Sequence, residues 1–358
     1  MSQKTDNNKS EKEFDYGGGE LVFNGIIRTD VHRDNPEQLR DQILDNLSEF
    51  TPGVPGSEGS GRIDIDLGSH AEANNLPSEL KDIASNLLSI EYRYEHYPNE
   101  TIEVVEYDDD GEATHTEAFP RKTHSVFAYW DYPRTIFVQG AKTRVEEVAP
   151  KINSSLDEDV SFNYHEFDEE FLLWLVIRDK HSLDLNTRLD IVELSASEIT
   201  GGNPEDFGRD AEVDNSDDIG QSLPIQAGIL KDMDFSMLEG DFSINGYRVN
   251  SKIYSDGRVR LYANRDLGEV SKLERALISL LFLSELIDEY EQWSNLSVDE
   301  KYPHPRYFKE LHDEANNQGA NYDFDFTSLV HRYADLRDEN PSDYEFEFEI
   351  YEPEDNNE

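Results

Sequence analysis

The sequence predicts an α+β fold in two units: an N-terminal mixed α/β sheet unit, followed by a smaller unit made of a β-meander and a long helix. Three observations support this prediction. Strand-like and helical segments alternate between residues 20 and 200. A hairpin pattern surrounds the turn sequence Ser255, Asp256 and Gly257. Residues 269–293 would carry apolar side chains on most sides of a helix, which is typical of a helix packed by several elements.

The first unit is expected to open with a strand at residues 21–27 and a helix that begins at Pro36 and reaches Phe50. A loop rich in glycine and proline follows at residues 51–61. The elements expected after it are a strand at 62–67, a helix from Pro77, and strands at 91–97, 101–107, 113–119 and 124–130. The intervening sequence 108–111 is a hairpin turn, because Asp and Gly tolerate its backbone angles.

The clearest pattern lies between residues 134 and 194. It predicts a strand at 135–138, a helix at 142–156, a strand at 160–164, a helix at 168–177 and a strand at 189–194. This alternation is typical of a small α/β unit. Asp168 stands where the second helix begins, so its carboxylate is better explained as an N-cap than as a metal ligand.

The second unit is expected to contain short strands near residues 235–238 and 242–244, then the hairpin, then the long helix. The expected parts of the chain are a disordered leader at 1–19, a mixed α/β domain at 20–200, an acidic linker at 201–222, a β-hairpin and helix domain at 223–335, and an acidic-aromatic tail at 336–358.

Acidic residues dominate the composition: 79 Asp and Glu oppose 32 Lys and Arg, for a formal net charge of −47. Such a surface repels itself in ordinary salt, whereas molar salt shortens the screening length to roughly 3 Å. In composition the chain resembles salt-adapted archaeal proteins, which implies a halophilic cytoplasm. The absence of cysteine excludes disulfides, thiolate nucleophiles and cysteine zinc sites. No apolar run reaches the ~20 residues that span a bilayer, so we expect no membrane partner.

Two stretches reverse this charge, and we call them the first and second basic islands. Each has five cations and one carboxylate. The first, residues 119–144, interleaves its cations with aromatic residues such as Trp130; the second, residues 248–265, does so with residues such as Tyr262. The cations are Arg121, Lys122, Arg134, Lys142 and Arg144 in the first island, and Arg248, Lys252, Arg258, Arg260 and Arg265 in the second.

The hairpin spacing places Arg248 and Lys252 on one face of a strand, and Arg258, Arg260 and Tyr262 along its partner. A face of Arg and Tyr can contact phosphates and stack bases, as single-stranded nucleic acid binding requires. Two other interpretations stay open: pairing with carboxylates of the same chain, and contact with an acidic partner protein. The nucleic-acid hypothesis expects the two islands to form one surface.

The tail alternates acidic with apolar residues, which places four apolar side chains on one face of a strand. These side chains are Tyr344, Phe346, Phe348 and Ile350. The strand would either complete the protein's own sheet or dock onto the sheet edge of a partner.

An enzymatic alternative rests on carboxylates. Asp64 and Asp66 stand two apart on an expected strand, and with Glu193 or Asp190 they could hold Mg²⁺ for a metal-dependent nuclease or phosphoesterase. The chain has no P-loop, no Gly-x-Gly-x-x-Gly after a strand, no Gly-x-Ser-x-Gly and no His-Glu-x-x-His. We therefore expect no cofactor and name no catalytic residue.

These observations predict a non-enzymatic binding protein that contacts nucleic acid or a protein assembly through its basic and aromatic patches. The alternatives are the metal-dependent nuclease or phosphoesterase, a structural subunit of a larger complex, and an acidic protein that mimics nucleic acid.

Overall fold

The computed structural model describes residues 14–16, 19–31, 36–107, 110–156, 160–201, 210–214, 216, 218–320 and 325–344. It combines eleven strands in one sheet with helices on both faces, so the predicted α+β class is confirmed. None of the helices in these segments is both long and apolar enough to cross a bilayer.

The strands are β1 Leu21–Val31, β2 Ser60–Ile65, β3 Leu87–His96, β4 Ile102–Tyr107, β5 Ala113–Ala118, β6 Lys122–Asp131, β7 Thr135–Gln139, β8 Val160–Tyr164, β9 Leu189–Thr200, β10 Asp210–Val213, β11 Asp234–Ile244, β12 Tyr247–Tyr254 and β13 Val259–Leu261. The sheet order is β10-β9-β11-β12-β13-β1-β7-β6-β3-β2, with β8 beside β1. β4 and β5 form a separate two-stranded sheet.

The helices are α1 Pro36–Asn46, α2 Leu67–Ala73, α3 Ser78–Asn86, α4 Lys142–Asn153, α5 Glu169–Lys180, α6 Leu223–Leu230, α7 Arg265–Glu269, α8 Lys272–Ser294, α9 Val298–Lys301, α10 Arg306–Asn317 and α11 Thr327–Leu336. Two short 3₁₀ turns lie at Ile219–Gln221 and Pro341–Tyr344. The caps follow the sequence: Asp168 accepts the Glu170 amide at the start of α5, and Ser271 accepts the Glu274 amide at the start of α8.

β1 organises the sheet because three strands pair with it. β7 lies along one edge, while β13 and β8 share the other. All described strand pairs are antiparallel, so no two neighbouring strands around α4 run parallel. The reason is that β7 and β8, which α4 connects, run in the same direction but have β1 between them.

The sheet crosses the predicted boundary between the two units. β9, the last strand of the expected first unit, pairs along its whole length with β11 of the expected second unit. The short strands expected near 235–238 and 242–244 are one strand, β11. Whether residues 20–200 and 223–335 fold as separate domains stays a prediction.

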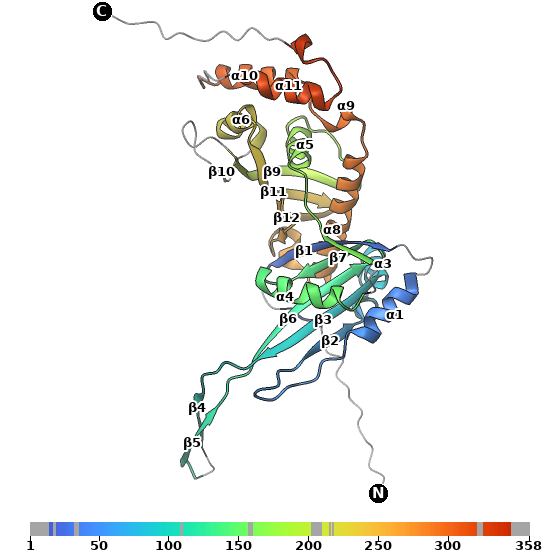
Figure 1. Ribbon diagram of the computed structural model, residues 1–358, viewed down its shortest axis with the longest axis vertical. Coiled ribbons are helices and arrows are strands. Elements are labelled where there is room, and N and C mark those ends of the chain that lie inside the picture. The colour runs from blue at the N-terminus through green and yellow to red at the C-terminus, as the bar shows by residue number, and fades with distance from the viewer. Residues whose placement is uncertain are drawn as a thin grey trace, which may run out of the picture.

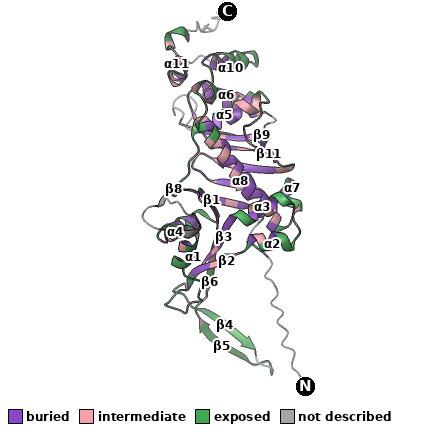
Figure 2. Cartoon of the chain, turned by 90° about the vertical axis from the view of Figure 1, so that its right-hand side faces the viewer, coloured by how far each residue is buried: buried purple, intermediate pink, exposed green. Residues whose placement is uncertain are grey.

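Two hydrophobic clusters cover the two faces of the sheet. The larger contains α5, α8 and their neighbours on one face, where Phe242 of β11 packs edge-on against Phe282 of α8 with ring centroids 5.4 Å apart. The smaller lies under α1 and α4, with Val145 and Val148 on Val138 and Ile27. Figure 2 shows α8 as a long helix that crosses this region between α5 and α3.

β4 and β5 project from the body as a hairpin that we call the arm, residues 102–118 (Figure 1). Nearly all of its described residues are exposed (Figure 2). Ile102, Val105 and Tyr107 leave large apolar side chains in solvent, and Tyr107 is 73% exposed.

Candidate binding groove

The hairpin of the second island has the expected two faces. On β12, Val249 and Ile253 are fully buried in the larger cluster, while Arg248, Lys252 and Tyr254 point the other way and stay partly exposed. This alternation follows from the two-residue period of a strand. It places the cations on the sheet face that lies opposite α8.

Every cation of the second island forms an ion pair with a carboxylate of its own chain. The pairs are Arg248 with Asp241 at 2.6 Å, Lys252 with Glu239 at 2.9 Å, Arg258 with Asp256 at 2.7 Å, Arg260 with Glu20 at 3.8 Å, and Arg265 with Asp241 at 3.0 Å. Asp241 is 4% exposed and also accepts a hydrogen bond from Asn250, so it holds this edge of the face together. The alternative of pairing within the chain therefore describes much of this island.

The aromatic residues of the first island mostly belong to the core. Trp130 is 3% exposed and Phe127 is 9% exposed, because β6 lies between β3 and β7 and both of its faces are covered. The expectation that Trp130 contacts a ligand is therefore wrong. The signal for core was its place in an apolar run on a central strand.

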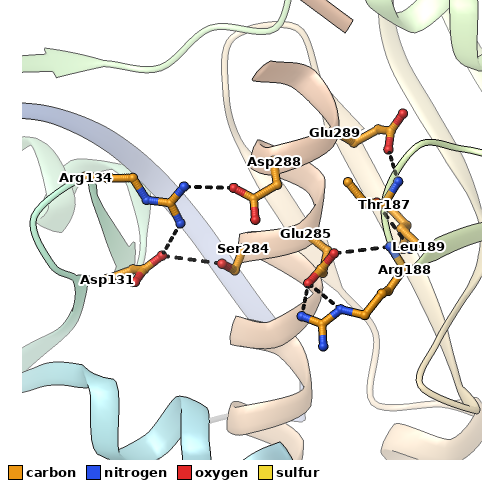
Figure 3. A network of polar contacts seen from close by, with 9 residues as sticks. All are labelled: Asp131, Arg134, Thr187, Arg188, Leu189, Ser284, Glu285, Asp288 and Glu289. Atoms are coloured by element: carbon orange, nitrogen blue, oxygen red, sulfur yellow. Dashed lines mark hydrogen bonds and ion pairs between the residues drawn. The ribbon is translucent and has the colours of Figure 1, made fainter. Parts of the chain in front are cut away.

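Two arginines of the first island support the structure. Arg121 lies 3.3 Å from the buried Glu95, which also accepts the amide of Gly53 and so ties down the glycine-rich loop. Arg134 bridges Asp131 and Asp288, and so joins the turn after β6 to α8 (Figure 3).

α8 also carries two buried carboxylates that sequence reasoning missed, and they point away from Arg134 toward residues 187–189 (Figure 3). Glu289 is fully buried and accepts the amides of Asn186 and Thr187, while Glu285 pairs with Arg188 (Figure 3). Two acids one turn apart, next to the apolar residues Leu283, Leu286 and Ile287, were the available signal, because buried charge needs partners. Their role is to anchor the segment that leads into β9.

Lys122, Lys142 and Arg144 form no ion pair with any carboxylate in the described part of the chain. Arg144 is half-buried on the first turn of α4, whereas both lysines are exposed. Burial lowers the pKa of His124, and the nearby Arg144 lowers it further, as expected in a positive neighbourhood.

A groove of about 400 Å³ brings the two islands together. Arg144 lines it from α4 and Arg260 lines it from β13, so one cation of each island lies in the same groove. The other lining residues are Tyr16, Glu20, Val22, Asn24, Ser125, Phe127, Gln139, Gly140 and Ala141.

The groove exists because β7 ends at Gln139 while β6 continues past it. Gly140 turns the chain toward α4, and its amide donates to the carbonyl of Val22 at 3.0 Å. Asn24, an extra residue in β1 between Phe23 and Gly25, donates its side-chain amide to the carbonyl of Gly140. α4 can approach β1 this closely only at Gly25, where a Cβ would lie 2.9 Å from Val145.

The groove is polar and weakly positive. Arg144 and Arg260 oppose the single carboxylate of Glu20. α4 begins at Ala141 without a side-chain cap, so its first amides and the positive end of its dipole face the same region. In a chain of net charge −47, this is a place where an anion meets little repulsion.

The magnesium site of the enzymatic alternative is not formed. Asp64 pairs with Arg62, and Asp66 lies beyond the end of β2, where its carboxylate caps α2 by accepting the Ser69 amide at 2.9 Å. Glu193 lies on β9, near the opposite end of the sheet from β2. No cluster of three His, Asp or Glu side chains suited to a metal occurs among the described residues.

Most of the residues on which the tail hypothesis depends lie outside the described part of the chain. Tyr344 ends the final 3₁₀ turn, where it bonds Glu339 and packs edge-on against His304. Phe346, Phe348 and Ile350 are not described.

No protein-family model matches this chain, and no curated protein matches it.

Proposed function

We propose that the protein is a non-enzymatic binding protein that holds a single-stranded nucleic acid along the groove and the adjoining face of β12 and β13. The observation that supports this most is that Arg144 and Arg260, from the two basic islands, line the same groove. Most of the remaining sequence is negatively charged and repels a polyanion, so a polyanion would be directed to this positive region.

The proposed contacts divide into two kinds. Arg144, Lys142 and the first amides of α4 would hold phosphate oxygens. Tyr254 and Tyr262 keep partly exposed rings beside this region, and Arg258 already stacks on Tyr254 at 4.3 Å from the ring centre. Half-exposed rings next to guanidinium groups are the kind of surface that takes up unpaired bases.

The salt in which an acidic protein works sets the balance between these contacts. Phosphate contacts weaken steeply as salt rises, while base stacking, worth about 1–3 kcal/mol per base, is much less affected. We therefore expect the tyrosines to supply more of the affinity in concentrated salt.

The test is fluorescence anisotropy of a labelled single-stranded DNA or RNA of about 20 nucleotides, in KCl from ~0.5 to ~3 M. The double variant Arg144→Ala with Arg260→Ala should lose roughly tenfold in affinity at the lower salt, with a smaller loss at the higher salt. Tyr262→Ala should cost about the same at both concentrations, because stacking needs no counterion release.

Lys309→Ala is the matched control. Lys309 is a surface lysine paired with Asp313 on α10, at the far end of the molecule, and its loss should leave binding unchanged. Absence of binding by the unmodified protein across this salt range, or equal affinity in the double variant, would refute the proposal.

A further inference from the structure

The arm projects from the body without a third strand beside it among the described residues. In this part of the chain β4 and β5 pair only with each other, and the projection of the hairpin leaves both faces in solvent (Figure 1). A two-stranded sheet on its own is marginally stable, and a third strand is normally needed to hold it. No described residue of the body supplies this third strand.

An unpaired strand edge lies directly beside the arm. β6 pairs with β3 along its whole length, from Asp131 to Lys122, but with β7 only from Asp131 to Phe127. Residues 122–126 therefore leave one edge without a strand neighbour among the described residues. Through Phe119, Pro120 and Arg121 this edge continues into β5, whose edge opposite β4 is also unpaired.

The two halves of this continuous edge carry opposite charge. Residues 101–119 contain no Lys or Arg, and Glu112 and Glu117 lie on or beside β5. Residues 121–126 contain Arg121, Lys122 and His124 and no acid. The reversal occurs at Pro120, the midpoint of the edge.

We propose that two copies of this chain associate by antiparallel pairing of this edge about a two-fold axis near Pro120, so that β5 of each copy lies against residues 122–126 of the other. An isologous contact of this kind is self-complementary, because the two-fold axis makes every contact between two residues occur twice. The acidic half of one copy faces the basic half of the other. Each arm gains a third strand, and both edges lose their unpaired amides and carbonyls.

The axis at Pro120 suits the chemistry of the pairing. Proline has no backbone amide to donate to the ladder. Its position at the centre leaves the backbone hydrogen bonds of the two halves, on either side of the axis, uninterrupted. Phe119, 47% exposed, lies beside its own counterpart across the axis and would be covered.

The first test is the mass of the full-length protein in ~2 M KCl, a concentration that screens its net charge. Sedimentation equilibrium should give twice the chain mass of 41.2 kDa at micromolar concentration. A monomer throughout the concentration range up to about 100 μM, where weak specific dimers are populated, would overturn the proposal.

The absence of cysteine makes the geometry testable by disulfide formation. Phe119→Cys lies near the axis and should form a disulfide-linked dimer on mild oxidation. A mixture of Thr116→Cys and His124→Cys chains should cross-link as a mixed dimer much faster than either chain alone, because the pairing places these positions opposite each other. This mixture keeps the test valid if loss of the Phe119 ring weakens the dimer.

Glu106→Cys is the matched control, since it lies on β4, on the far side of β5 from the proposed contact. It should stay unlinked under the same oxidation. Equal linkage of Glu106→Cys, or no preference for the Thr116 and His124 mixture, would rule out this pairing even if a dimer forms.

Charge exchange tests the complementarity separately. Thr123→Glu should weaken the dimer about fivefold in ~0.5 M KCl, because the pairing places position 123 opposite Glu117 and the two-fold axis repeats this contact. Adding Glu117→Lys should restore much of the lost affinity. If the second change weakens the dimer further, the opposed charges do not meet and the proposed register fails.

Discussion

The two basic islands have the same charge in the sequence but differ in the structure. In the second island each cation forms an ion pair within the chain, and Asp241 alone holds two arginines. In the first, Arg121 and Arg134 are paired, while Lys122, Lys142 and Arg144 have no ion-pair partner among the described residues. Local charge in a sequence therefore measures the cations present, and only the structure shows which are available to a ligand.

The largest effect that tests this comparison is expected at Asp241. Asp241→Ala removes a buried acceptor shared by Arg248, Arg265 and Asn250, and should lower the free energy of unfolding by about 2–4 kcal/mol. Urea unfolding in ~2 M KCl measures it. The control is Asp256→Ala, whose pair with Arg258 is exposed and should be worth less than about 1 kcal/mol. If both variants lost the same free energy of unfolding, the buried pairs of Asp241 would be no more important to stability than the exposed pair of Asp256.

Burial alone can also keep an ionisable side chain neutral, and His165 is an example outside the two islands. Burial lowers the pKa of His165 to about 4, with a further contribution from Arg28. The unfolded chain therefore takes up the proton first, and stability falls as the pH drops from about 6.5 toward 4. The full loss is roughly 3 kcal/mol.

His165→Phe keeps an aromatic ring between Phe167 and Tyr290 and removes the titration. Subtracting its unfolding free energy from that of the unmodified protein, between pH 7 and pH 4.5, should isolate this loss. A difference that stays constant with pH would show that His165 has the same pKa in the folded and unfolded states, and would contradict this prediction.

A smaller effect is expected where a first-island arginine is paired at the surface. Asp288→Ala removes the contact between Arg134 and α8, and should cost about 0.5–1 kcal/mol because both side chains are partly exposed. The same urea experiment applies. The loss should shrink between ~0.5 and ~3 M KCl as the pair is screened.

The smallest change in stability is expected at the unpaired cation in the groove. Arg144→Ala should alter the free energy of unfolding by less than about 0.5 kcal/mol, because no described partner is lost and alanine favours the helix. A loss as large as that of Asp241→Ala would mean that Arg144 is structural, and the contrast between the islands would disappear.

Local periodicity predicted most of the elements around the site. The strands at residues 135–138 and 160–164 and the helix at 142–156 are present within a few residues, as β7, β8 and α4. α10 was not foreseen, although Tyr307, Phe308, Leu311 and Ala315 recur at helical spacing and are buried. The pattern was available there and was overlooked.

The pairing of strands was not predictable from the same signals. Nothing local to Leu21 indicates that it faces Leu261 across the ladder, or that β9 joins β11. The groove depends on these long-range pairs and on the end of β7 at Gln139, so Tyr16, Asn24 and Gln139 could not be named from spacing. The projection of the arm escaped prediction for the same reason, since a strand pattern does not reveal whether a strand has neighbours.

The position of β1 has a consequence for synthesis of the chain. Its first residues leave the ribosome early, but β13, the partner of Leu21 to Phe23, follows only after most of the described chain has been made. β7 and β8 can pair with β1 much sooner and cover the remainder of its edges. Closure of the sheet must await a contact of very long sequence separation, which slows folding and leaves a short strand edge open to other nascent chains.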